Sequence, residues 1–139
     1  MCPFLIAIFV VILDQITKAI VITCLKYGES YLIINKIFYL TLVKNTGAAF
    51  GLFKNQAAFF ILVSGLAITF IIYFLSKKKV NSYLPLALIL GGAIGNSIDR
   101  LRFGYVVDFL DFKVWPVFNV ADSCISIGTF LLFLLIIKR

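Results

Sequence analysis

The chain has 139 residues, of which 63% are hydrophobic and only 14% charged, and its mean hydropathy is +1.10. This balance lies far outside that of soluble domains and indicates an integral membrane protein. The net charge of +7 can suggest a nucleic-acid partner, but the cations are not gathered into one basic face interleaved with aromatic residues, so nucleic acid is excluded.

Four apolar segments are long enough to be transmembrane helices, because one crossing of the hydrocarbon core needs about 20 mostly apolar residues. They cover 3–25, 56–75, 82–98 and roughly 119–137. The first could instead be a cleaved signal peptide, but it lacks a cationic start, is longer than a typical signal core and contains Asp14 and Lys18. We therefore expect an all-α membrane protein in which residues 1–139 form a single integral membrane domain with four transmembrane helices.

The distribution of lysines predicts the orientation of these helices. Lys77, Lys78 and Lys79 follow the second segment, and Lys138 and Arg139 follow the fourth. Both groups lie on one side of a four-helix bundle, and the positive-inside rule assigns that side to the cytoplasm. Both termini are then cytoplasmic, and the loops 26–55 and 100–118 face outward.

The first outer loop contains the sequence KIFYLTLVKNTGAAFGLF, in which β-branched and aromatic residues surround a turn with glycine. This pattern predicts a short strand or hairpin at the membrane surface. The third apolar segment contains Gly91, Gly92, Ala93 and Gly95, and such small residues allow helix backbones to approach closely.

Acidic residues are rare in this chain, and ionisable groups within or beside membrane helices mark function by default. The six acids are Asp14, Glu29, Asp99, Asp108, Asp111 and Asp122. Asp14 and Lys18 are four residues apart on one helix face, so we expect a neutralising pair. Asp99 lies beside Arg100 and on the same face as Asn96, and its simple structural roles are to hold that arginine or to cap a loop. Asp111 is expected to be a solvated loop residue.

Asp108 and Asp122 are the remaining candidates for chemistry. Asp122 follows Asn119 by three residues, so Asn119 can cap the fourth helix beside it. Asp108 follows the apolar YVV, where desolvation raises a carboxyl pKa. Two such carboxyls in proximity share one proton, as in aspartic proteases.

The absence of histidine from the sequence narrows the hydrolytic alternatives. Ser-His and Cys-His nucleophiles and the HExxH zinc motif require histidine. A Ser-Lys dyad of Lys18 with Ser64, Ser97 or Ser123 remains open on these residues alone. Cys2, Cys24 and Cys124 are scattered and predict neither disulfides nor a zinc site.

Five ordered blocks, which run from the first apolar segment to the last, resemble the signature motifs of the signal peptidase II family. They are DQITK (14–18), VKNTGAAFG (43–51), GGAIGNSIDR (91–100), YVVDFLDF (105–112) and FNVADS (118–123). The resemblance implies an intramembrane aspartic endopeptidase of the bacterial cytoplasmic membrane. Its expected reaction is removal of the signal peptide from diacylglyceryl-modified prolipoproteins, with cleavage immediately before the lipidated cysteine and the active site near the outer face.

The same resemblance assigns roles to residues of this chain. It implies that Asp108 and Asp122 are the catalytic dyad and that Asp99 is a supporting residue. The positions that would shape the site or the substrate channel are Asp14, Lys18, Asn45, Gly47, Asn96, Arg100, Asn119 and Ala121. We expect no metal or organic cofactor, and we expect a monomer whose partners are lipid-modified prolipoproteins and membrane lipids.

Two other functions, neither of them enzymatic, are also consistent with a small membrane protein that contains clustered acidic residues. One is an ion-coupled transporter subunit with a proton relay, although no internal repeat is visible and the acids cluster at one face. The other is a noncatalytic assembly protein. A protease, unlike a scaffold, should not tolerate asparagine at Asp108 and Asp122.

Overall fold

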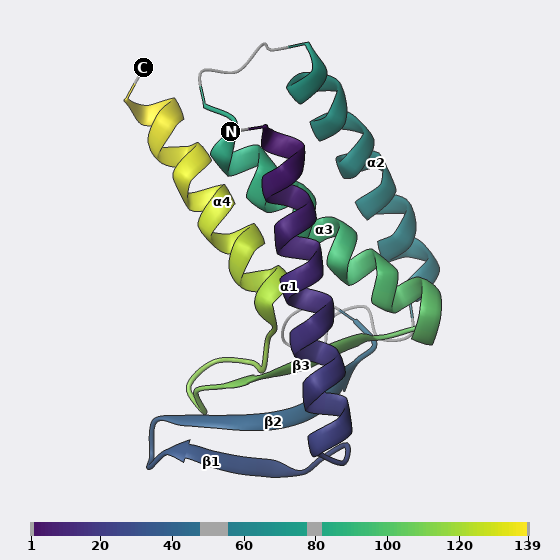
Figure 1. The fold of residues 1–139 in the computed structure, drawn as a ribbon, viewed down its shortest axis with the longest axis vertical. Coiled ribbons are helices and arrows are strands. Elements are labelled where there is room, and N and C mark those ends of the chain that lie inside the picture. The colour runs from purple at the N-terminus through teal and green to yellow at the C-terminus, as the bar shows by residue number, and fades with distance from the viewer. Residues whose placement is uncertain (1, 48–55, 78–81, 139) are drawn as a thin grey trace.

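The computed structural model of the chain describes residues 2–47, 56–77 and 82–138, which form a mostly helical molecule with one small sheet. The helices are α1 (Pro3–Cys24), α2 (Ala57–Ser76), α3 (Leu84–Phe103) and α4 (Val120–Ile137). The strands are β1 (Ser30–Ile34), β2 (Phe38–Asn45) and β3 (Val106–Asp111), paired antiparallel in the order β1-β2-β3. The sheet lies at one end of the helices, and both chain termini lie at the other (Figure 1).

Three of the predicted apolar segments agree closely with observed helices. Within the described ranges, α1, α2 and α4 are long and apolar enough to cross a membrane. The third segment does not meet the same measure, because the last part of α3 carries Asn96, Asp99, Arg100 and Arg102. The structure therefore shows three helices with the composition of membrane spans and one more polar helix.

The predicted end of the third helix was wrong, because α3 continues from Ile98 to Phe103 through the start of the expected outer loop. Arg100 and Arg102 lie in its last turn, where cations favour the negative end of the helix dipole. Gly104 then ends the helix with φ of 77°, and its N–H donates to the Arg100 carbonyl. The longer helix extends to the edge of the sheet.

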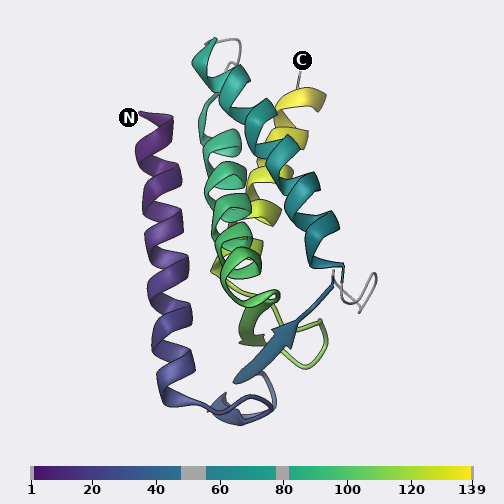
Figure 2. The ribbon, with the colours of Figure 1, turned by 90° about the vertical axis from the view of Figure 1, so that its right-hand side faces the viewer.

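Small residues allow α3 to occupy the middle of the bundle, where it packs against each of the other helices (Figure 2). A Cβ at Gly91 would lie 2.6 Å from Cβ of Val10 on α1, and a Cβ at Gly92 would meet the backbone carbonyl of Ala121 on α4. The predicted close packing at these glycines is confirmed.

Exchange of Gly92 for alanine is expected to destabilise the bundle by about 1–3 kcal/mol, because a backbone oxygen cannot move away from the new methyl group. Gly65 on α2 is the matched control, since a Cβ there meets nothing within 4 Å. Gly65→Ala should be neutral or stabilise by up to about 1 kcal/mol through helix propensity. Thermal midpoints of both variants in detergent test this difference, and equal midpoints would contradict the close approach of α3 and α4.

The sheet contains the strand predicted for the first outer loop and two strands that were not predicted. β2 lies within the segment KIFYLTLVKNTGAAFGLF, which was expected to form a strand or hairpin, and it pairs with β1, which precedes that segment. Residues 48–53 of the segment, including part of the VKNTGAAFG block, fall outside the described residues. β3 was assigned to a loop. Five of its six residues are buried, so its sequence lacks the alternation that reveals a half-exposed strand. Lys78, Lys79 and Arg139, used for the predicted orientation, are also outside the described residues.

Candidate active site

Asp108 is positioned by β3 and is almost completely buried. Its Oδ2 accepts a hydrogen bond of 2.8 Å from Asn45 Nδ2 at the end of β2, and its Oδ1 accepts one of 2.7 Å from Asn119 Nδ2. The β2–β3 pairing places Asp108 opposite Val43, two residues before Asn45. Both oxygens of this carboxyl are thus fixed by amide donors from other elements.

Asp122 lies in the first turn of α4, where Asn119 forms the predicted N-cap: the Asp122 backbone N–H donates to Asn119 Oδ1 at 2.8 Å. Asp122 Oδ1 accepts a hydrogen bond of 2.7 Å from Asn96 Nδ2 on α3. Asn119 Nδ2 also lies 3.1 Å from Asn96 Oδ1. Two asparagines in contact therefore join the Asp108 carboxyl to the Asp122 carboxyl.

A buried lysine, Lys18, contacts the residues that surround the two carboxyls. Lys18 Nζ lies 2.8 Å from Asp14 Oδ2, which confirms the predicted pair, and 2.8 Å from Asp99 Oδ2. It also donates to Asn96 Oδ1 at 3.1 Å. Among the described residues, no ion pair or hydrogen bond joins Asp99 to Arg100, so of the two roles considered for Asp99 the first is not observed. Asp99 instead accepts from Lys18 and, at 3.0 Å, from the backbone N–H of Val107 in β3.

Asp14 and Asp99 have further donors that the sequence analysis did not assign. Asp14 Oδ1 accepts a hydrogen bond of 2.9 Å from the backbone N–H of Ala121, a residue with no exposed surface. Gln15 Nε2 lies 3.2 Å from Asp14 Oδ2, 3.0 Å from Asp99 Oδ1 and 3.2 Å from the Gly95 carbonyl oxygen. Gln15 belongs to the DQITK block, so its position in that motif was the available signal.

Arg100 and Gly47 are linked to Asp108 through Asn45. The guanidinium of Arg100 lies 4.8 Å from the ring centroid of Phe60 on α2, and Nη2 donates to the Gly47 carbonyl at 3.4 Å. The Gly47 N–H donates to Asn45 Oδ1 at 3.0 Å. Polar contacts therefore connect all eleven residues singled out from the sequence. They are Asp14, Lys18, Asn45, Gly47, Asn96, Asp99, Arg100, Asp108, Asn119, Ala121 and Asp122.

Asp111 does not belong to this network, and the prediction that it is a solvated loop residue was wrong. It ends β3, is only 4% exposed, and accepts hydrogen bonds from Thr41 Oγ1 at 2.6 Å and from Lys113 Nζ at 2.6 Å. Burial by itself would raise the pKa of Asp111, but the hydrogen bonds from Lys113 and Thr41 outweigh it and lower the pKa. Asp111 therefore stabilises the end of the strand.

A cavity of about 1090 Å³ opens between the sheet, α2, α3 and α4, and it is lined by Asp108, Asp122 and Arg100. The pKa of Asp108 is raised to about 7, chiefly by burial and further by repulsion from Asp122, against the opposing hydrogen bonds from Asn45 and Asn119. A carboxyl that retains its proton near neutral pH, beside a second carboxyl at the same cavity, is suited to acid–base chemistry.

The serine residues considered for a Ser-Lys dyad have other partners. The hydroxyls of Ser64, Ser97 and Ser123 each donate to the backbone carbonyl four residues earlier in the chain. Lys18 is engaged by two aspartates and one asparagine. Within the described residues, the geometry therefore favours the two aspartates over a Ser-Lys pair.

Known proteins resemble this chain over nearly its whole length. Residues 6–138 match the family described as signal peptidase (SPase) II. A lipoprotein signal peptidase of Halothermothrix orenii is 45% identical over 94% of this chain and 92% of its own length. A protein of the same name from Caldanaerobacter subterraneus subsp. tengcongensis is 51% identical over the same shares of the two chains.

Two solved structures of bacterial membrane enzymes have the same fold. The first superposes with a TM-score of 0.92 at 37% identity and covers 98% of this chain and 87% of that one. The second has a TM-score of 0.89 at 36% identity and covers 99% and 93%. The chain therefore belongs to the signal peptidase II family and is a membrane aspartic protease that removes signal peptides from prolipoproteins.

Proposed function

We propose that Asp108 and Asp122 are the catalytic dyad, which cleaves diacylglyceryl-modified prolipoproteins immediately before the lipidated cysteine. The observation that carries this assignment is the presence of both carboxyls at one cavity, linked through Asn96 and Asn119. The raised pKa of Asp108 supports its role as the general acid. Asp122, in ionised form, then removes a proton from the attacking water while Asp108 protonates the carbonyl oxygen, which gives a gem-diol intermediate. As this intermediate collapses, Asp122 passes the proton from water to the leaving amine and Asp108 takes a proton back from a gem-diol hydroxyl, so that both carboxyls return to their starting states.

The amide donors around the dyad have a defined part in this reaction. Asn45 and Asn119 donate to Asp108, and Asn96 donates to Asp122, so each carboxyl is held in one orientation before substrate arrives. Arg100 lies at the same cavity, where its fixed charge can stabilise negative charge that develops on the carbonyl oxygen. The remaining residues of the network, Asp14, Lys18, Gly47, Asp99 and Ala121, position these groups.

We also propose a membrane arrangement, which the distribution of lysines along the sequence supports. All four helices cross a bacterial cytoplasmic membrane, with both termini cytoplasmic and the sheet at the outer face. Asn96 and Asp99 of α3, which are buried among protein side chains rather than open to lipid, then lie at the depth of the active site. The two acyl chains of the substrate stay in the bilayer, and an extended segment beside Asn45 presents the scissile bond to a monomeric enzyme.

The direct test is cleavage by purified protein in bilayers, followed by gel shift and by the mass of the new N-terminus. A diacylglyceryl-modified prolipoprotein should yield a product that begins with the lipidated cysteine, and the same precursor without lipid should be cleaved much more slowly. An intact modified precursor would contradict the proposal and favour a transporter or scaffold role. Cleavage at another peptide bond would contradict the assigned position.

The pH dependence of kcat/KM should have a basic limb near pH 7, since the general acid is lost as pH rises through the pKa of Asp108. Asn45 stabilises the ionised form of this carboxyl by donating to it. Asn45→Ala should therefore raise the pKa and move the basic limb to higher pH, while the maximal rate falls. A pH–rate profile measures this shift, and an unmoved limb would contradict the role of Asp108 as the acid.

A further inference from the structure

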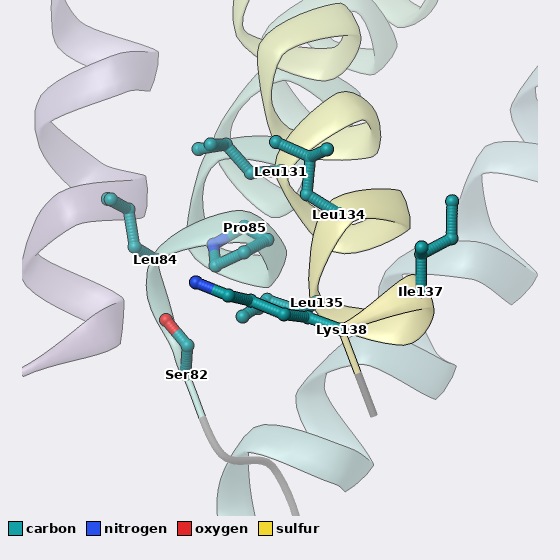
Figure 3. A pocket seen from close by; sticks show the side chains of 8 residues that line it. All are labelled: Ser82, Leu84, Pro85, Leu131, Leu134, Leu135, Ile137 and Lys138. Atoms are coloured by element: carbon teal, nitrogen blue, oxygen red, sulfur yellow. The ribbon is translucent and has the colours of Figure 1, made fainter.

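A second cavity, of about 600 Å³, lies far from the dyad, between the N-terminal end of α3 and the C-terminal end of α4 (Figure 3). Six of its eight lining residues are apolar: Leu84, Pro85, Leu131, Leu134, Leu135 and Ile137. The other two are Ser82 and Lys138. Its volume is within the ~300–1,000 Å³ range of small-molecule sites. We refer to it as the α3–α4 groove.

Helix packing accounts for the position of the groove. A Cβ at Gly128 would lie 2.7 Å from the carbonyl oxygen of Pro85, so α3 and α4 are in close contact there. The groove lies toward the end of α4 beyond this contact, where Leu134 and Ile137 remain exposed. In a bilayer, these apolar walls face hydrocarbon and are suited to an acyl chain.

Of the described residues that line the groove, only Lys138 carries a charge, which is positive. In Figure 3 the Lys138 side chain extends across the groove from α4 toward α3, with its nitrogen on the side of the Ser82 hydroxyl. Among the described residues, the ion pairs join Lys18 and Lys113 to aspartates and do not include Lys138.

No acid of the helices that form the groove is close enough to neutralise this lysine. Asp99 is 14 residues from Pro85 along α3, and Asp122 is 16 residues from Lys138 along α4. These separations correspond to about 20 Å or more at 1.5 Å per residue. Lys77–Lys79 and Arg139 add further cations in the sequence after α2 and α4. Within the part of the chain that the structure describes, the groove therefore combines apolar walls with a lysine that has no acidic partner.

We propose that the α3–α4 groove is a binding site for an anionic phospholipid, which places one acyl chain along the apolar walls and its phosphate beside Lys138 and Ser82. Apolar contact alone gives little preference within a bilayer, because lipid chains are as apolar as the groove. Selectivity for this lipid comes from the phosphate and from its net charge. Basic pockets between membrane helices bind anionic headgroups in this way.

The test uses purified, delipidated protein titrated with phosphatidylglycerol or phosphatidylcholine in mixed micelles, with bound lipid counted by native mass spectrometry. One phosphatidylglycerol should bind at least about ten-fold more tightly than phosphatidylcholine. Lys138→Gln should weaken phosphatidylglycerol binding about five-fold, which corresponds to the ~1 kcal/mol that one lysine contributes near an anionic membrane surface. Leu134→Trp, which fills the groove, should abolish the tight site.

Lys77→Gln is the matched control, because it removes one charge from the same end of the bundle without lining the groove. It should leave the tight site intact. An equal loss in Lys77→Gln and Lys138→Gln would mean general surface attraction and would overturn the proposal, as would equal binding of the two lipids. A dimer that dissociates on Leu134→Trp would assign the groove to a second copy instead. Thermal midpoints of all variants verify folding, since the three substituted residues are exposed.

Discussion

Asp108→Asn and Asp122→Asn are each expected to lower kcat/KM for prolipoprotein cleavage by about 10⁴-fold, because each removes one half of the acid–base pair. Asparagine preserves the size of the side chain but neither accepts a proton from water nor donates one to a carbonyl at neutral pH. The double variant should be no worse than either single variant, because groups that act as a unit are not additive. Initial rates from the gel-shift assay measure all three effects.

Asp111→Asn is the matched control for these variants. It changes a buried carboxyl on the same strand, three residues from Asp108, but Asp111 contacts Thr41 and Lys113 and does not line the cavity. It should retain cleavage within about ten-fold, with some loss of thermal stability. Rapid cleavage by both single dyad variants, or abolition by Asp111→Asn in folded protein, would contradict the proposed dyad.

Lys18→Met is expected to destabilise the protein by about 3–5 kcal/mol, because it leaves the buried carboxylates of Asp14 and Asp99 without their shared cation. The thermal midpoint should fall by about 10 °C. Cleavage should fall as well, since Lys18 also holds Asn96, which donates to Asp122. Thermal unfolding in detergent and cleavage rates below the midpoint separate the two effects.

Lys113→Met provides the comparison, because it removes a lysine that is itself half exposed, although its partner Asp111 is buried. The Lys113 side chain is 46% exposed, whereas that of Lys18 is 3% exposed. Asp111 keeps its hydrogen bonds from Thr41 and from the Lys113 backbone N–H, and water reaches the lysine end of the pair, so this variant should lose only about 1 kcal/mol and unfold within about 3 °C of wild type. Similar losses in the two lysine variants would contradict a special role for the buried cation.

Local patterns accounted for the predictions that succeeded without tertiary information. The pair of Asp14 and Lys18 follows from helix periodicity, and the Asn119 cap follows from a spacing of three residues. The glycines of α3 indicated close helix packing from residue size alone. Each of these features depends on neighbours within one element or on composition, so a single sequence contains the required information.

Errors arose where a residue's partner is distant in sequence. Asp111 is buried because β3 pairs with β2, which brings Thr41 to it across 70 residues. Asp99 pairs with Lys18 across two helices. β3 was missed because a strand buried on both faces has no alternating pattern. Strand pairing and helix packing decide these contacts, and neither is visible in local periodicity.

By itself, the sequence determined that this is a membrane protein with little room for a soluble domain. Most of its residues belong to long apolar segments, which are stable in hydrocarbon and not in water. It also reduced the hydrolytic options to a few aspartates and serines, and the ordered motif blocks identified the family. Only the tertiary structure decided that Asp108 and Asp122 share a cavity. Asp108 comes from a strand and is held by Asn45 of β2, 63 residues earlier in the chain. Asp122 comes from a helix and is held by Asn96 of α3, 26 residues earlier. Their proximity therefore depends on how the sheet packs against the end of the helix bundle.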